Sequence, residues 1–395
     1  MPSFSRTALA VPGSGIRRIH EIALRMPDVL ALAVGEPDQP VAPHVLAAAS
    51  RAWLADDTDY TANAGIAPLR GAIAAKLRRV NGMPVDADHV WVTAGATEAL
   101  YLALSLVLEP GDEVLVPDPG YTTFTMAPRM LSAVPVPYRL DREHDFRPEV
   151  AALESQVTSR TRAIIVNSPS NPLGVVFPEP VLRELLAFAS RHDLWLISDE
   201  VYEAFTWGVP HVSPAAFDEE GRVLTVHSFS KTYALTGARV GSLVVPRGLD
   251  AVLRTYQEAL VSCVNTPAQH AALAAITGPQ DAVETAAGHY RENLAAATAL
   301  LDELGIRYLE PRGAFYLWVD VSYASGGDVA HWAERFLLEQ RVSVAPGSAF
   351  GAAGEGWIRV CAAAPRATLL AGLGRLPRPD RAARPAEQDA LASGA

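Results

Sequence analysis

The sequence predicts an α/β protein with a large domain, built on a mixed and mainly parallel sheet, and a smaller α+β domain. Helical and strand-like segments alternate from about residue 46 to 275, as expected for a sheet whose strands are joined by crossover helices. The strand-like segments are short, apolar and largely β-branched, which is typical of strands buried on both faces. Beyond them, a long alanine-rich helical segment precedes two further strands. This second pattern indicates the smaller domain.

The elements of the large domain follow in order. Buried strands are expected at residues 90–93, 113–116, 163–167, 195–198, 223–227 and 241–245. Helices are expected between them at residues 66–80, 97–108, 179–190 and 267–277. In the smaller domain, strands are expected around residues 314–319 and 357–360.

These elements suggest four segments along the chain. Residues 1–45 are expected to pack with the small domain, residues 46–275 to form the large domain, and residues 276–376 the small C-terminal domain. Residues 377–395 are rich in Arg, Pro and Ala without a periodic apolar face. Such a tail is predicted to be disordered.

The composition excludes several classes of protein. A net charge of -11 over 395 residues argues against a nucleic-acid binder, which needs a surplus of Lys and Arg. Two cysteines, Cys263 and Cys361, cannot build a disulfide framework, and no Cys/His cluster predicts a metal site. The N-terminus lacks the apolar core of a signal peptide, and no apolar run approaches the roughly 18 residues of a membrane span. The expected compartment is the cytoplasm.

The chemistry is centred on Lys231, which follows the strand at 223–227. A lone lysine at a strand end is more often a surface residue, but three polar residues stand at fixed distances from this one. Arg239 lies eight residues on between two glycines, Asp199 lies 32 residues before at the end of another strand, and Asn171 lies in a Pro- and Gly-rich loop. Since open α/β sheets bind ligands at the carboxyl ends of their strands, these residues predict one site.

Together these motifs resemble the signature of the class I/II aminotransferases, which depend on pyridoxal 5′-phosphate (PLP) and have fold type I. The matching segments are Asn171-Pro172-x-Gly174, Asp199-x-x-Tyr202, Ser228-x-x-Lys231 and Gly237-x-Arg239-x-Gly241. The resemblance extends from about residue 32 to 363. It implies the PLP-dependent transferase fold of type I.

The resemblance also implies roles at the cofactor ring. Lys231 would carry PLP as a Schiff base and, once released, act as the general base. Asp199 would pair with the pyridinium nitrogen and so maintain the electron sink. Asn171 and Tyr202 would donate hydrogen bonds to the phenolic oxygen and lower the pKa of the imine.

The phosphate needs several donors. The backbone amides of Gly95, Ala96 and Thr97 lie at the start of a helix, where the N-terminus attracts an anion. Ser228 and Arg239 would complete this phosphate cup, because a hydroxyl and a guanidinium are strong donors to phosphate.

Four further residues are assigned by the resemblance. Tyr121 would stack on the pyridine ring. Arg359 and the Gly35 amide would bind the α-carboxylate of the substrate, the arginine by a bidentate pair. Asn171, besides its role at the ring, is also expected to bind the substrate. Tyr60 would reach the phosphate in the neighbouring subunit, so the protein is expected to be a homodimer with shared active sites.

The predicted function is transfer of the amino group of an L-α-amino acid to a 2-oxo acid. A PLP-dependent lyase, a cyclopropane-forming synthase and a catalytically inactive binding protein remain alternatives, since fold does not fix reaction. The bacterial aspartate aminotransferases that the chain resembles often carry, at the position of Thr97, a lysine that binds the distal carboxylate. Thr97 and Glu98 stand here instead, which favours a neutral donor, aromatic or aliphatic. An arginine in the segment 16–18, such as Arg17, could recognise an acidic group instead.

Overall fold

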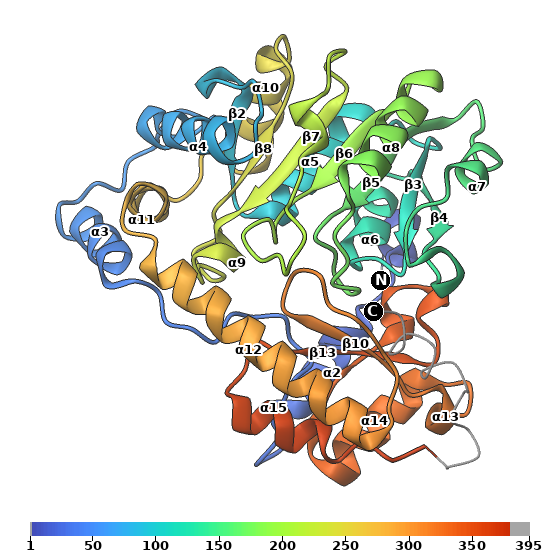
Figure 1. Cartoon of the computed structure of the whole chain (residues 1–395). Coiled ribbons are helices and arrows are strands. Elements are labelled where there is room, and N and C mark those ends of the chain that lie inside the picture. The colour runs from blue at the N-terminus through green and yellow to red at the C-terminus, as the bar shows by residue number, and fades with distance from the viewer. Residues whose placement is uncertain (1, 380–395) are drawn as a thin grey trace.

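A computed structural model describes residues 2–379 and contains a large mixed sheet (Figure 1). Its strand order is β2-β8-β7-β6-β5-β3-β4, and only β8 runs antiparallel to its neighbours. The bounds are β2 (Val90–Thr93), β3 (Glu113–Asp118), β4 (Val134–Arg139), β5 (Thr161–Asn167), β6 (Trp195–Asp199), β7 (Val223–Ser228) and β8 (Gly241–Val244). The predicted mixed, mainly parallel sheet is confirmed, and each of the six expected strands overlaps an observed one.

Sequence analysis missed one strand, β4, at the edge of this sheet. Its residues alternate as Val134-Pro135-Val136-Pro137, and the two prolines argue against a strand inside a sheet. Proline is tolerated at an edge, because the missing N–H then faces solvent rather than a neighbouring strand. β4 pairs with β3 alone, so the prolines select the edge position.

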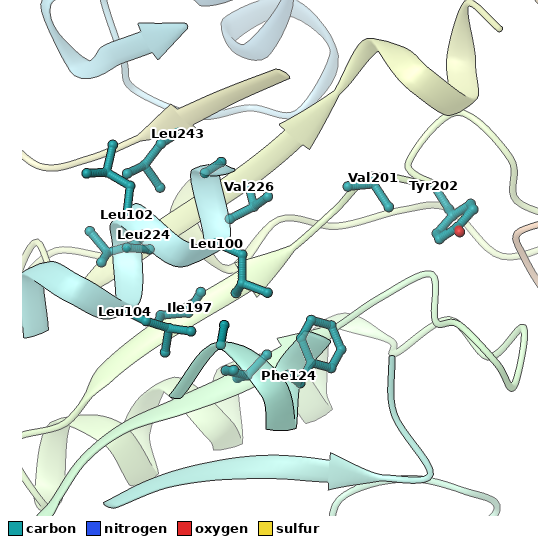
Figure 2. Packing of buried hydrophobic residues seen from close by; sticks show 14 of the residues in the cluster. Leu100, Leu102, Leu104, Phe124, Ile197, Val201, Tyr202, Leu224, Val226 and Leu243 are labelled. Atoms are coloured by element: carbon teal, nitrogen blue, oxygen red, sulfur yellow. The ribbon is translucent and has the colours of Figure 1, made fainter. Parts of the chain in front are cut away.

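Helices cover both faces of the sheet. α5 and α6 pack on one face, and Figure 2 shows Leu100 and Leu104 of α5 among Ile197, Leu224 and other buried side chains of that core. α8 packs on the other face, as do α4 and α11 towards the opposite edge. The helices of this part are α3 (Pro43–Leu54), α4 (Ala67–Val80), α5 (Ala96–Val107), α6 (Thr123–Met130), α7 (Val150–Glu154), α8 (Glu179–Arg191), α9 (Phe229–Thr232), α10 (Asp250–Leu260) and α11 (Thr266–Thr277).

A second, four-stranded sheet of order β12-β13-β10-β9 lies below the first in Figure 1. Its strands are β9 (Tyr308–Leu309), β10 (Tyr316–Asp320), β12 (Ala345–Pro346) and β13 (Trp357–Cys361). Its helices are α12 (Asp281–Leu304), α13 (Ser322–Ser325), α14 (Val329–Gln340) and α15 (Arg366–Leu373). Short 3₁₀ turns lie at η1 (Ala87–His89), η2 (Arg142–His144), η3 (Pro214–Ala216), η4 (Gly347–Phe350) and η5 (Ala352–Gly354). This part has an apolar core of its own.

The N-terminal segment contacts both parts of the molecule. α2 (Gly15–Ala23) and β1 (Leu30–Ala31) join the small part: β1 pairs in parallel with β11 (Val342–Ser343), and Ile19 packs into the small core. α1 (Arg6–Ala10) instead lies near α6, where Thr7 Oγ1 is 3.1 Å from Ser132 Oγ. The proposed domain boundaries stay a prediction, and the tail predicted to be disordered lies outside the described residues from 380 on. Within residues 2–379, every helix is too short or too polar to cross a membrane.

Candidate active site

A cavity of about 550 Å³ lies where the carboxyl ends of the central strands meet the small part and the N-terminal segment. Eleven of the residues predicted from the sequence line it: Gly35, Ala96, Thr97, Tyr121, Asn171, Asp199, Tyr202, Ser228, Lys231, Arg239 and Arg359. Two predicted residues do not line it. Gly95 stands just before the α5 wall, and Tyr60 points into solvent with 89% of its surface exposed.

The parallel register of the sheet gathers the first polar groups. β5 ends at Asn167, β6 at Asp199 and β7 at Ser228, and Asn167 is the register partner of Asp199. Because the carboxyl ends of parallel strands share one edge of a sheet, these three side chains face the same cavity. Asp199 therefore lies at the end of its strand, as the sequence predicts.

Asp199 is a buried carboxyl group with one hydrogen bond from the backbone, donated by the Val201 N–H at 3.2 Å. Burial raises the pKa of Asp199 to about 7, because the charged form loses hydration that one amide does not replace. Such a carboxylate is stabilised by a cationic ligand that enters the cavity.

Lys231 extends from the short helix α9 and donates to the backbone carbonyl of Gly35 at 2.7 Å. Burial lowers the pKa of Lys231 to about 8. An appreciable share of this amine is therefore neutral near pH 7, as a lysine that attacks a carbonyl group requires.

One end of the cavity is built to receive an anion. The first-turn amides of Ala96 and Thr97 begin α5, and the guanidinium of Arg239 lies beside this turn. The Gly95 amide was expected to join them, but it donates instead to the carbonyl of Thr93 at 2.7 Å. Gly95 contributes space, since a Cβ there would stand 2.4 Å from Nη2 of Arg239.

Ser228 completes this end of the cavity. Its Oγ accepts from the Ser230 backbone N–H at 3.1 Å, so the hydroxyl proton remains for a ligand. Helix amides, a hydroxyl and a guanidinium are the donor set that proteins use for phosphate.

Arg359, on β13, supplies another cationic group to the cavity lining. It is 2% exposed, and its two terminal nitrogens donate to Asn171 Oδ1 at 2.7 Å and to the Ala33 carbonyl at 2.5 Å. Within residues 2–379 it has no carboxylate partner, and its Nε makes no hydrogen bond. Because an unpaired buried charge is costly, this guanidinium favours an anionic ligand.

The two halves of the site are joined by hydrogen bonds. Asn171 accepts from Arg359 with its side chain, and its backbone N–H donates to Asn167 Oδ1 at 2.8 Å. Asn167 in turn donates to the backbone carbonyl of Asp199 at 3.1 Å. The arginine and the buried carboxylate are thereby held in one rigid network.

Sequence reasoning missed several lining residues, among them Tyr316 and Asn167, which hydrogen-bond other residues of the site. Asn167 stood at the end of an expected strand, where a buried amide needs partners. Tyr316 stood inside an expected apolar strand, where a phenol is uncommon unless its hydroxyl is bound. A polar residue at the end of a buried strand and a tyrosine inside an apolar strand are the sequence patterns that could have pointed to these two residues.

A buried charged cluster lies on the far face of the sheet. Glu200, Glu203 and His227 place one ligand atom each within 4.8 Å of one another. However, the Lys76 ammonium bonds Glu203, and His211 Nε2 lies 3.0 Å from a Glu200 oxygen. Burial alone would raise the pKa of Glu203, but Lys76 and His227 outweigh it and hold the pKa well below its usual value. The chain itself therefore provides the cations for these carboxylates.

Comparison with solved structures defines the fold. The chain superposes on the aspartate aminotransferase of Thermus thermophilus with maleate with a TM-score of 0.90 and 36% identity, covering 95% of this chain and 99% of that one. An aromatic aminotransferase from Pyrococcus horikoshii gives a TM-score of 0.85 at 36% identity, over 91% and 97% of the two chains. The protein thus has the PLP-dependent transferase fold of type I, as predicted.

The model of the family described as "Aminotransferase class I and II" matches residues 27–376, and the chain belongs to this family. Over 88% of its length it is 37% identical to the aspartate aminotransferase of Pyrococcus abyssi, covering 90% of that protein. It is likewise 35% identical to aromatic-amino-acid aminotransferase 2 of Thermococcus litoralis, over the same shares of the two chains. The protein is an aminotransferase of a family that uses PLP, and that prediction is confirmed.

Proposed function

We propose that the protein binds PLP in the 550 Å³ cavity, with Lys231 as its covalent anchor, and transfers the amino group of an L-α-amino acid to a 2-oxo acid. The observation that carries the proposal is the meeting of three groups in one cavity. A phosphate-type anion cup, the buried carboxylate of Asp199 and the buried amine of Lys231 match the phosphate, the basic ring nitrogen and the aldehyde of PLP. When bound, PLP supplies an electron sink for bonds at the substrate α-carbon.

The residues around the ring position would hold charge and protons. Asp199 would stabilise a protonated ring nitrogen, which in turn would stabilise the buried carboxylate. Tyr202 and the Asn171 amide would donate to the ring oxygen, and Tyr121 would pack on the ring face. Lys231, once released, would take the proton from the substrate α-carbon and return it on the cofactor side of the substrate nitrogen.

Arg359 and Gly35 form the proposed subsite for the substrate α-carboxylate. The guanidinium of Arg359 has a buried, unbonded Nε, and Gly35 belongs to the loop that Lys231 contacts. A carboxylate placed here would lie between the lysine and the small part, so substrate binding would hold the α-carbon near the amine.

The amino donor is proposed to be neutral, with an aromatic or aliphatic side chain. Ile16, Val34, Leu100 and Tyr121 provide apolar surface in the lining of the cavity. Thr97 stands where a distal carboxylate would meet a lysine in the aspartate enzymes that the sequence resembles. A tyrosine or leucine side chain would therefore bury against this wall.

An acidic donor is the second candidate, and it rests on Arg17. Arg17 lines the cavity and has no ion-pair partner within the described chain, whereas Arg18 binds Glu334 at 2.6 Å. Replacing Arg17 by Gln should lower the ratio of kcat/KM for glutamate over phenylalanine by roughly fivefold. The same change at Arg18 is the matched control and should leave the ratio unaltered. An unchanged ratio in both variants leaves the neutral donor as the better reading.

A homodimer with shared active sites is proposed from Tyr60. Tyr60 does not line the cavity of its own chain and is largely exposed. Exposed apolar side chains also lie on two nearby elements: Trp53 and Leu54 on α3, which precedes the Tyr60 segment, and Tyr256 and Leu260 on α10. Asn63 Nδ2 donates to the Arg254 carbonyl at 3.2 Å, so the Tyr60 segment runs against α10. If these exposed apolar side chains packed against a second copy of the chain, Tyr60 would lie close to the phosphate cup of the partner.

Product analysis tests the proposed reaction. The loaded enzyme is mixed with single amino acids, its visible spectrum is followed, and the product is identified. A spectral change together with the matching 2-oxo acid supports amino transfer. A spectral change with a cleaved or cyclised product supports a lyase or synthase, and the absence of any change supports a binding protein.

A further inference from the structure

Tyr316 contacts both Tyr202 and Arg359 in the cavity wall and has no role assigned so far. It lies on β10, is 1% exposed, and borders the cavity beside Lys231 and Arg359. Its hydroxyl and its ring each contact a different part of the proposed machinery. These two contacts can be separated experimentally.

The hydroxyl of Tyr316 lies 2.7 Å from the hydroxyl of Tyr202, and both groups are buried. In such a pair one phenol donates and the other accepts, so the partner fixes where each proton points. If Tyr202 donates to the ring oxygen of the cofactor, its own oxygen is left to accept. Tyr316 is then placed to donate to it.

The ring of Tyr316 lies under the guanidinium of Arg359, with Cζ of the arginine 4.3 Å from the ring centre. This cation–π contact holds the plane of the guanidinium, and the positive charge makes the phenol a better donor. Gly35 allows the arrangement, because a Cβ at that residue would stand 2.0 Å from the Tyr316 oxygen.

We propose that Tyr316 is a positioning residue that couples the two ends of the site. Its hydroxyl donates to Tyr202 and orients that phenol towards the cofactor, while its ring orients Arg359 towards the substrate carboxylate. The inference rests on the proposed function, since it assigns Tyr202 to the cofactor and Arg359 to the substrate.

The hydroxyl is tested by a double-variant cycle on the loaded enzyme. Tyr316→Phe removes the hydroxyl and keeps the ring. The pH midpoint at which the visible absorption of the bound cofactor titrates should rise by about half to one pH unit, because a weakened donor at the ring oxygen disfavours the deprotonated form. In a Tyr202→Phe background the same change should have no effect on the midpoint. Equal shifts in both backgrounds would overturn the coupling through Tyr202.

The ring is tested by a second variant and by a readout without cofactor. Tyr316→Leu should raise KM for the amino acid by about 3- to 30-fold, whereas Tyr316→Phe should leave KM nearly unchanged. In the cofactor-free protein, 3-phenylpropionate should raise the unfolding temperature of wild type and of Tyr316→Phe, but raise that of Tyr316→Leu much less. Equal stabilisation of all three proteins would overturn the role of the ring.

Tyr290→Phe is the matched control. Tyr290 is a fully buried tyrosine that packs on Phe315, outside the cavity lining, and its hydroxyl bonds no other side chain within residues 2–379. Its variant should change neither the titration midpoint nor KM, and a shift like that of Tyr316→Phe would show a general packing effect. Failure of the proposed function is separate, because a wild type that gains no visible band with PLP contradicts that function before any variant is made.

Discussion

The side-chain nitrogen of Lys231 lies 2.7 Å from the carbonyl oxygen of Gly35, and this hydrogen bond joins α9 of the large sheet to the loop after β1. The amine is therefore held at the junction of the large sheet and the N-terminal segment. Burial there lowers its pKa to about 8. The reactivity of the protein with its cofactor should follow this pKa.

The addition of PLP to the cofactor-free protein should accelerate as pH rises through about 8. Since only the neutral amine attacks a carbonyl group, the rate should climb from pH 7 and level off above about pH 9. Stopped-flow absorbance measures the rate, with Lys231→Ala as the control that should lack this phase. A midpoint near 10.5, the ordinary value for lysine, would mean that the amine is not desolvated.

Asp199→Asn should stabilise the cofactor-free protein at alkaline pH. Burial raises the pKa of Asp199 from 3.8 to about 7, so the folded state holds a proton that the unfolded chain releases. This contribution to stability is complete below about pH 4 and is lost as pH rises through 7. Asparagine does not ionise. The variant should therefore have a higher urea midpoint of unfolding than wild type at pH 8, and this difference between the two midpoints should shrink at pH 5.

In the stability experiment, a difference between Asp199→Asn and wild type that is independent of pH would contradict the burial argument. The same substitution should also lower the turnover of the loaded enzyme. The ring nitrogen loses its anionic partner, so several kcal/mol of transition-state stabilisation should be lost. Near-normal turnover would show that another group tunes the ring.

Gly95→Ala should weaken cofactor binding. The added Cβ would stand 2.4 Å from Nη2 of Arg239, and Gly95 has a φ of +80, which L side chains rarely adopt. Equilibrium titration with PLP should show a loss of tenfold or more, whereas Gly71→Ala on the open surface of α4 should bind normally. Unchanged affinity in Gly95→Ala would remove Arg239 from the anion cup.

Hybrid dimers should recover activity from two inactive variants. Tyr60→Ala and Lys231→Ala each damage one contribution to a shared site, so a mixed dimer contains one site with both residues intact. Activity after subunit exchange is measured against each variant alone, with exchange verified by mass. Verified exchange without recovery would place Tyr60 outside the partner's site.

The sequence was most informative where short apolar runs end in polar residues. The strands at 90–93 and 195–198 and the site residues Asp199 and Lys231 followed from such endings. The proline-rich strand β4 was missed because edge pairing overrides the local signal. The role of Tyr316 was missed because its partner Tyr202 lies 114 residues away, and only the tertiary fold brings the two hydroxyls together.

The most direct test of the central claim is the site of covalent attachment. The protein is loaded with PLP, reduced with borohydride, digested and mapped by mass spectrometry. The account predicts a pyridoxyl group on Lys231 and, in Lys231→Ala, none. A label on Lys76 or the absence of a label in wild type would contradict it.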